Sequence, residues 1–157
     1  MKLSKRTYPG FTIIEVLAVL MLMSIVAAIA IVSAPSFSSY QTTPEAEVIK
    51  GHLRYAQTRA MDTSTIWGIT FAGGSYTLFN NITGSNPILP GVSSSTATLP
   101  SGMTITAGTV SFDTWGTPYT DTGATSAQNT GGYRSFNLTL GTTTALIQVS
   151  DNTGFIP

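Results

Sequence analysis

The chain has 157 residues, of which 9% are charged, and its seven basic side chains balance its seven acidic ones. This length accommodates one ordinary domain, and the balanced charge offers no electrostatic basis for nucleic-acid binding by the chain as a whole. Cysteine is absent, which excludes a disulfide framework, a thiolate metal site and a cysteine nucleophile.

The first ten residues are distinctly basic. They contain Lys2, Lys5 and Arg6, whereas every acidic residue lies later in the chain. Without residues 1–10, four basic side chains would face seven acidic ones, so the rest of the protein is acidic.

An apolar run follows from Phe11 to Ala34, and as a helix it would be about 36 Å long, enough to cross a bilayer. Basic residues precede it and the next base is Lys50, so the positive-inside rule predicts a cytoplasmic N-terminus and an exported head. A cleavable secretory signal is the alternative. The run is longer than a typical signal core, and Ala34 followed by Pro35 matches a signal cleavage site poorly, but the small residues there leave that alternative open.

Glu15 is the one acidic residue of the apolar run. An ionised carboxylate costs roughly 2.5 to 3.5 kcal/mol at the centre of a membrane helix, so an unpaired acid there is rare and points to a function. The stretch from Gly10 to Leu17, Gly-Phe-Thr-Ile-Ile-Glu-Val-Leu, resembles the prepilin signature of the type IV pilin-like proteins. The resemblance implies cleavage between Gly10 and Phe11 by a prepilin peptidase, N-methylation of Phe11, and an assembly role for Glu15. Pro9 departs from the basic or small polar residue that often precedes the glycine.

Cleavage would create an α-ammonium group at Phe11, and this cation and the Glu15 carboxylate attract strongly in apolar surroundings. Within one helix the two groups are close, and between staggered helices their pairing would also set the register. The resemblance implies the second arrangement, in which Glu15 of an incoming subunit meets the terminal amine of a neighbour. The alternative is an acid at a helix end that reaches water without a partner.

Beyond the apolar run, Pro35 and the small polar residues of 36–43 predict a kink or a local loosening of the stem. Thr42 or Thr43 is a candidate N-cap for a renewed helix, with Pro44 in its first turn.

Apolar residues then recur at helical spacing and predict a stripe that covers a β-sheet. They are Ile49, Leu53, Ala56, Ala60 and Met61. Basic residues lie away from this stripe and are interpreted as a solvated face rather than a binding patch; they are Lys50, Arg54 and Arg59.

The residues after 62 are rich in Thr, Ser, Gly and Asn, which is typical of short strands and turns. Alternating patterns predict one antiparallel sheet of four to six strands, with a Pro/Gly/Ser/Thr-rich loop over 80–100. The expected strands are 65–71 and 75–79 around a tight glycine turn, then 103–106, 109–112, 134–140 and 145–149.

The cluster from Phe112 to Pro118 and the C-terminal Thr153-Gly154 resemble the heads of H-type minor pseudopilins of type II secretion and of FimT-like minor pilins. Some FimT-like proteins are DNA receptors with an Arg-rich patch after the terminal Thr-Gly. Here Phe155-Ile156-Pro157 stands in that place, and the only base beyond residue 62 is Arg134. Because duplex affinity depends on neutralising phosphates, DNA binding is disfavoured.

The chain gives little support to metal or catalytic chemistry. His52 is the only histidine and is interpreted as a surface or packing residue. A calcium site from Asp113, Asp121, Asp151 and Asn152 is conceivable, but these residues are more simply explained as turn and cap residues. No catalytic residues, metal ligands or cofactors are therefore expected, and the protein is not predicted to be an enzyme.

The predicted fold class is α+β, with a long N-terminal hydrophobic helix whose C-terminal half packs on an antiparallel β-sheet head. The expected segments are a leader (1–10), a transmembrane and filament-core helix (11–35), an amphipathic continuation of the stem (36–61) and a β-rich head (62–157).

The predicted function is a structural subunit, a minor pilin or pseudopilin, of a type IV pilus or type II secretion filament. Its expected partners are the prepilin peptidase, other pilin or pseudopilin subunits and the inner-membrane assembly platform. The expected location is the bacterial inner membrane, single-pass with a periplasmic head, and then a filament or the cell surface. A major pilin, an adhesive or DNA-receiving minor pilin, and a plain membrane-anchored envelope protein are the alternatives.

Overall fold

The computed structural model describes residues 10–32, 37–82 and 86–157, and for residues 30–32 and 37–40 it describes the backbone alone. The chain divides into two compact units, Met1–Ser36 and Phe37–Pro157. The leader before Gly10 and the predicted kink at Pro35 lie outside the described residues.

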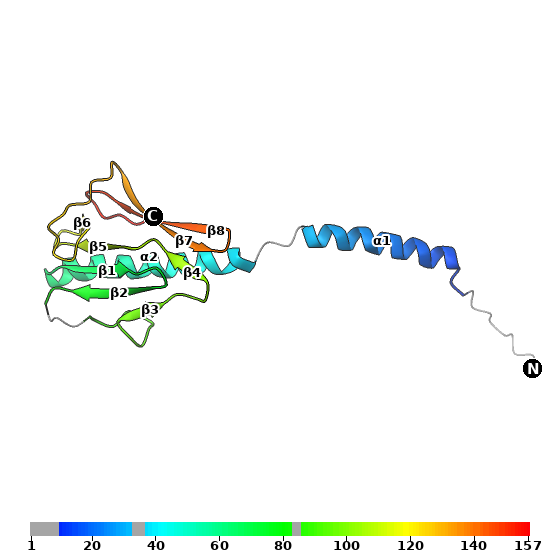
Figure 1. The fold of residues 1–157 in the computed structure, drawn as a ribbon, viewed down its shortest axis with the longest axis horizontal. Coiled ribbons are helices and arrows are strands. Elements are labelled where there is room, and N and C mark those ends of the chain that lie inside the picture. Colours follow the sequence, from blue (N-terminus) through cyan, green and yellow to red (C-terminus); the bar gives the residue numbers. More distant parts are fainter. Residues whose placement is uncertain (1–9, 33–36, 83–85) are drawn as a thin grey trace, which may run out of the picture. The chain divides into compact units, whose positions relative to one another are not determined.

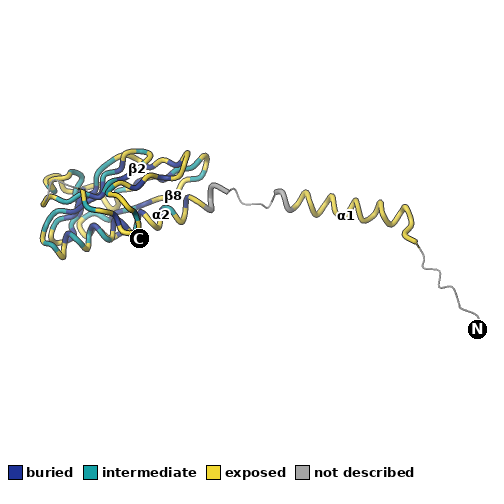
Figure 2. Tube along the Cα trace, turned by 90° about the horizontal axis from the view of Figure 1, so that it is seen from below, coloured by how far each residue is buried: buried dark blue, intermediate teal, exposed yellow. Residues whose placement is uncertain are grey.

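Helix α1 (Ile13–Val32) is the helix described in the first unit (Figure 1). Its side chains are apolar around its whole circumference, and every residue from Ile13 to Ile29 is exposed (Figure 2). Ala, Leu and Met have high intrinsic helix propensity, and that of Ile is only moderately lower, so the local sequence supports a helix here. Within the described part of the chain, no helix meets the length and hydropathy required to cross a membrane.

Helix α2 (Phe37–Thr63) begins earlier than the sequence predicts. The predicted cap at Thr42 or Thr43 is wrong, since both residues lie inside the helix, and Pro44 is an interior residue. Proline removes one intrahelical hydrogen bond, and tertiary packing offsets that loss. Thr42 is completely buried and Ala46 is 3% exposed, so the turns on both sides of Pro44 are held by the head.

The predicted apolar stripe of α2 is confirmed at four of its five positions. Ile49, Leu53, Ala56 and Ala60 are completely buried, whereas Met61 is 46% exposed. The helix packs against strands of both sheets described below, so the stripe covers the core of the head (Figure 1).

Among its described residues, the head contains eight strands in two antiparallel sheets, so the predicted single sheet of four to six strands is wrong. The first sheet has the order β3-β2-β1-β5-β6 and the second the order β4-β7-β8. Two short strands, β3 and β6, were not predicted. The strands are β1 (Trp67–Phe71), β2 (Ser75–Asn80), β3 (Thr96–Thr98), β4 (Met103–Ile105), β5 (Gly108–Phe112), β6 (Pro118–Tyr119), β7 (Tyr133–Leu140) and β8 (Thr143–Ser150).

Both predicted hairpins are confirmed. β1 pairs with β2 around a turn in which Gly73 has a φ of 74°, and β7 pairs with β8 along all eight residues of each strand. The two sheets meet in one core, where the rings of Phe71 and Phe136 lie 4.8 Å apart, centre to centre. A backbone hydrogen bond from Ile105 to Gly73 (2.8 Å) also joins β4 to the turn of the other sheet.

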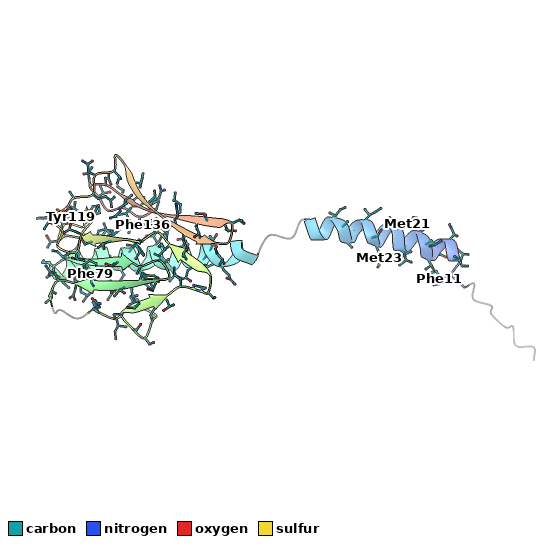
Figure 3. All side chains as sticks on the ribbon, in the orientation of Figure 1. Phe11, Met21, Met23, Phe79, Tyr119 and Phe136 are labelled. Atoms are coloured by element: carbon teal, nitrogen blue, oxygen red, sulfur yellow. The ribbon has the colours of Figure 1, made fainter. Side chains whose placement is uncertain are left out.

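Gly68 lies in the middle of the first sheet, where no larger residue fits. It pairs with Phe79 across β2 and with Ser111 across β5. A methyl group there would lie 2.6 Å from the Phe79 ring (labelled in Figure 3) and 2.4 Å from the Val110 carbonyl oxygen. The aromatic ring thus fills the space that the glycine leaves, as is common for cross-strand glycine and aromatic pairs.

We expect Gly68→Ala to lower the free energy of unfolding by about 2 to 3 kcal/mol, because the new methyl group collides with backbone on the neighbouring strand. Gly74→Ala is the matched control, since its methyl group meets nothing within 4 Å. Urea unfolding of the full chain in detergent, followed by tryptophan fluorescence, measures both. Equal stability of the two variants would show that the sheet adapts without cost.

Candidate functional site: the N-terminal motif and the head junction

The start of α1 places Glu15 in the first helical turn. The Thr12 carbonyl accepts from the N–H groups of Glu15 (3.1 Å) and Val16 (3.2 Å), and the Thr12 hydroxyl also accepts from the Glu15 N–H (3.3 Å). Thr12 is therefore the N-cap, and Thr-x-x-Glu has the spacing of a capping box. The helix dipole favours an acidic residue at this end of a helix.

Phe11 and Glu15 lie one helical turn apart and line the same surface hollow with Val16, Val19 and Leu20. Phe11 lies just before the helix and is 84% exposed, and Met21 and Met23 are exposed further along the helix (Figure 3). Thus the structure brings the predicted cleavage residue and the predicted assembly acid to one face. The other residues that line this hollow have apolar side chains, so Glu15 would be the anionic partner of an amine placed there.

The head contains a second cluster of interacting residues, only some of which the sequence patterns indicated. Gln57 of α2 donates through Nε2 to the carbonyl oxygens of Gly116 and Thr153, both at 3.0 Å. It thereby joins the helix to the turn after β5 and to the C-terminal segment. We call Gln57, Gly116, Thr153 and Gly154 the head junction.

Two glycines make the head junction possible. Gly116 has a φ of 79° and Gly154 a φ of 63°, a region that other residues adopt only with strain. A methyl group on Gly154 would lie 2.5 Å from the Gly116 carbonyl oxygen and 3.0 Å from the Phe112 ring. The Phe112 to Pro118 cluster and the terminal Thr-Gly, which the sequence singled out separately, are therefore parts of one packing unit.

The interpretation of the basic residues of α2 as a solvated face is wrong in part. Arg54 donates to the carbonyl oxygen of Ile156 through Nε (3.3 Å) and Nη2 (3.0 Å), so it holds the C-terminal segment. Arg59 pairs with Asp62 at 3.1 Å and lies 5.2 Å from the centre of the Trp67 ring. The Ile156 carbonyl and the Trp67 ring, which the fold brings to these two arginines, distinguish their roles from simple solvation.

The interpretation of the aspartates as turn and cap residues is confirmed. Asp113 accepts from the N–H groups of Trp115 and Thr117, both at 2.9 Å. Asp121 accepts from the backbone of Ser126 at 2.7 Å, and this bond and further ones from Thr125 and Gly123 lower the pKa of Asp121 to about 2. Each carboxylate belongs to its own turn, and among the described residues no three His, Cys, Asp or Glu side chains are grouped to hold a metal ion.

His52 is a buried packing residue, as predicted. Its Nε2 lies 3.0 Å from the carbonyl oxygen of Pro90, which can only accept, so this nitrogen carries the proton. In the neutral ring Nδ1 then accepts from the Tyr76 hydroxyl at 2.9 Å. The pair fixes the 86–95 segment against α2, and burial raises the pKa of Tyr76.

Arg134 packs against the head and is partly buried. Its guanidinium donates to the Thr109 carbonyl oxygen and lies 4.9 Å from the centre of the Phe136 ring. Burial lowers the pKa of Arg134. The one base beyond residue 62 is thus a packing residue, which gives phosphate groups no free cation in that part of the described chain.

Sequence reasoning missed Gln57, the residue that connects the head junction. A glutamine on a helix is common, and no pattern in one sequence shows that its amide reaches two carbonyls that are 59 and 96 positions away. The only available signal was the occurrence of glycines at 116 and 154, each next to turn residues.

With this geometry described, the chain is an α+β protein whose apolar N-terminal helix carries a pilin-type start and whose β-rich head packs on a second helix. A model of the prokaryotic N-terminal methylation motif matches residues 5–31, which include Gly10, Phe11 and Glu15. A comparison with curated protein sequences finds no match.

Among solved structures, the chain is similar to the crystal structure of the type IV minor pilin FimU of Pseudomonas aeruginosa strain PAO1. The TM-score is 0.53 and the identity 13%, and the match covers 76% of this chain and 88% of that chain. At this identity the similarity concerns the fold. The predicted pilin resemblance and the predicted α+β class are confirmed: the chain combines an N-terminal methylation motif with a minor-pilin-like fold.

We expect Gly154→Ala to destabilise the head by about 2 kcal/mol more than Gly141→Ala, because the two positions share the same backbone strain but differ in space. Gly141 has a φ of 60° with nothing within 4 Å of an added methyl group, whereas at Gly154 (φ 63°) that group meets the head junction. Thermal and urea unfolding of both full-length variants provide the measurement. Similar losses would mean that backbone strain alone, and not the close approach of Gly116, requires glycine at 154.

Proposed function

We propose that this chain is a structural, non-catalytic subunit of a type IV pilin-like filament, of the minor pilin or pseudopilin kind. The observation that carries the proposal is the single carboxylate of Glu15 on an apolar helix, one turn after Phe11 at a pilin-type cleavage motif. The fold of the head, which is similar to that of a minor pilin, supports the same function.

The proposed maturation begins with a cut between Gly10 and Phe11 by a prepilin peptidase, followed by methylation of the new amine. The amine of one subunit then pairs with Glu15 of a neighbour while the apolar helices pack together. A carboxylate and an ammonium group attract far more strongly in apolar surroundings than in water, and each cancels the cost of burying the other. This pairing selects one stagger between neighbouring helices.

The proposed location before assembly is the inner membrane, with the basic N-terminus in the cytoplasm and the head in the periplasm. The apolar run from Phe11 to Ala34 has the length for a single pass, and its side chains from Ile13 to Ile29 are exposed on all faces of α1. Such a helix is stable only when lipid or other apolar helices surround it. The inner-membrane assembly platform and other pilin or pseudopilin subunits are the proposed partners.

Two features favour a subunit of a filament over a DNA receptor. Arg134 is occupied by Thr109 and Phe136, and the C-terminal segment Phe155-Ile156-Pro157 carries no basic side chain. Whether the subunit is minor or major is distinguished by its abundance in sheared surface filaments.

Mass spectrometry of the mature protein tests the proposal directly. We expect a terminus that begins at N-methylated Phe11, with residues 1–10 removed. Replacement of Gly10 by a bulkier residue is expected to retain the leader, which provides the control for the cleavage site. An intact Met1 in the native protein, or a start after Ala34, would contradict the proposal and favour an anchored envelope protein or a secreted one.

Glu15→Val is expected to enter the membrane but to join filaments at least about 100-fold less, because loss of one partner from a buried ion pair costs roughly 3 to 5 kcal/mol. Glu47→Gln is the matched control: it removes an exposed carboxylate whose recorded partner is Lys50 on the same helix. Immunoblots of membrane and sheared-filament fractions measure the two pools. Filament incorporation of Glu15→Val at the level of the control would remove the proposed assembly mechanism.

A further inference from the structure

The head has a surface hollow at the open end of the β7–β8 hairpin, beside the head junction: the Ser150 hydroxyl of its lining lies 2.8 Å from the Thr153 hydroxyl. Its volume is about 410 Å³, within the usual range of small-molecule sites. The hollow is lined by Asn129, Gly131, Gly132, Tyr133, Ser150, Asp151 and Asn152. Since nothing in the filament proposal uses these residues, the hollow requires its own explanation.

The hollow is built around one carboxylate. Asp151 accepts from the N–H groups of Thr130 (2.7 Å), Gly131 (2.9 Å) and Gly132 (3.1 Å) and from Nε2 of Gln128 (2.6 Å). These bonds close the 128–132 segment over the end of β8, and the Gln128 bond contributes most to lowering the pKa of Asp151. Both carboxylate oxygens are therefore occupied by donors, so Asp151 shapes the hollow and is not free to bind a cation.

The rest of the lining is uncharged, so an anion finds no counter-charge there, and the donors around Asp151 leave its oxygens no open position for a cation. Asn129 and Asn152 supply amides, and in the described part of the chain no hydrogen bond to either side chain is recorded. Each amide offers both donors and an acceptor, which is what a hydroxyl group or another amide requires.

Tyr133 adds an aromatic surface beside these amides. It is 49% exposed, although it is the first residue of a strand that is paired along its whole length. A half-exposed ring that shares a hollow with unpaired amides suits a ligand with both an apolar and a polar side.

The outer face of the β7–β8 hairpin, next to the hollow, is also uncharged. Ser135 pairs with Gln148, Asn137 with Leu146 and Thr139 with Thr144 on this face. None of these side chains is charged, and the array extends the hollow by three residue pairs. A ligand of several linked units would find hydrogen-bonding partners along it.

We propose that the hollow and the adjoining hairpin face bind a neutral oligosaccharide. A sugar ring has an apolar face of C–H groups that packs on an aromatic ring, and a rim of hydroxyls that pairs with amides and hydroxyls. Tyr133 provides the first contact, and Asn129 and Asn152 provide the second. The one charge in the lining is the Asp151 carboxylate, which repels acidic sugars. An uncharged peptide is the other ligand that the test below distinguishes.

The test uses the full chain, isotopically labelled, in micelles of a phosphocholine detergent that contains no sugar. Hexasaccharides of glucose, galactose and N-acetylglucosamine are the probes, and amide chemical shifts of Gly131, Gly132 and Tyr133 are the readout. We expect saturable shifts at these residues with at least one probe. Tyr133→Ala should weaken binding about fivefold or more, whereas Tyr133→Phe should stay within about twofold, because the ring supplies the contact.

Two further variants sharpen the result. Asn152→Gly removes one amide and suits the φ of 65° at this position, so it is expected to weaken binding without unfolding the turn. Trp115→Ala removes an aromatic ring that is 85% exposed and lies outside the hollow, so it should bind like the native chain. The proposal is overturned if no neutral probe saturates, if Tyr133→Ala binds as tightly as the native chain, or if hyaluronan or an uncharged peptide binds the hollow in preference.

Discussion

One carboxylate in an otherwise apolar helix is the constraint on which the N-terminal unit depends. Glu15 is held in the first turn by the Thr12 cap, where the positive end of the helix dipole meets its charge. That local support does not remove the cost of placing the charge among apolar side chains. A cation beside the carboxylate would offset this cost. The α-ammonium group that cleavage would create at Phe11 is a cation that the chain itself can provide. In this view, maturation and assembly are coupled by electrostatics.

The head, by contrast, is held by packing and by neutral hydrogen bonds. Helix α2 buries its apolar stripe against two sheets, and Phe71 and Phe136 join those sheets in one core. Gln57 then connects the helix to two distant loops through their carbonyl groups. Because these contacts converge on α2, we expect the helix, the turn at Gly116 and the C-terminal segment to move as one body. Under the proposed function, this rigidity suits a domain that keeps its shape while its stem enters a filament.

Charge is scarce on the head, and most of it is used internally. Asp113, Asp121 and Asp151 each close a turn, and Arg134 packs against Phe136. Outside α2, the described outer surface consists mostly of hydroxyl, amide and scattered apolar groups. Recognition by such a surface depends on shape and hydrogen bonding, so it responds little to salt. The proposed assembly pairing and the proposed saccharide site therefore use different physics in the two units.

The sequence alone determined the features that depend on neighbours along the chain. The N-terminal motif, the two hairpins and the stripe on α2 follow from local spacing and composition, and each was predicted from them. The tertiary structure decided what depends on distant partners: the division into two sheets, the start of α2 before Pro44, and the roles of Gln57 and Arg54. The physical reason is the separation along the chain over which each effect acts. Periodicity and turn chemistry act over a few residues. Burial and side-chain pairing join residues that only the folded chain brings together.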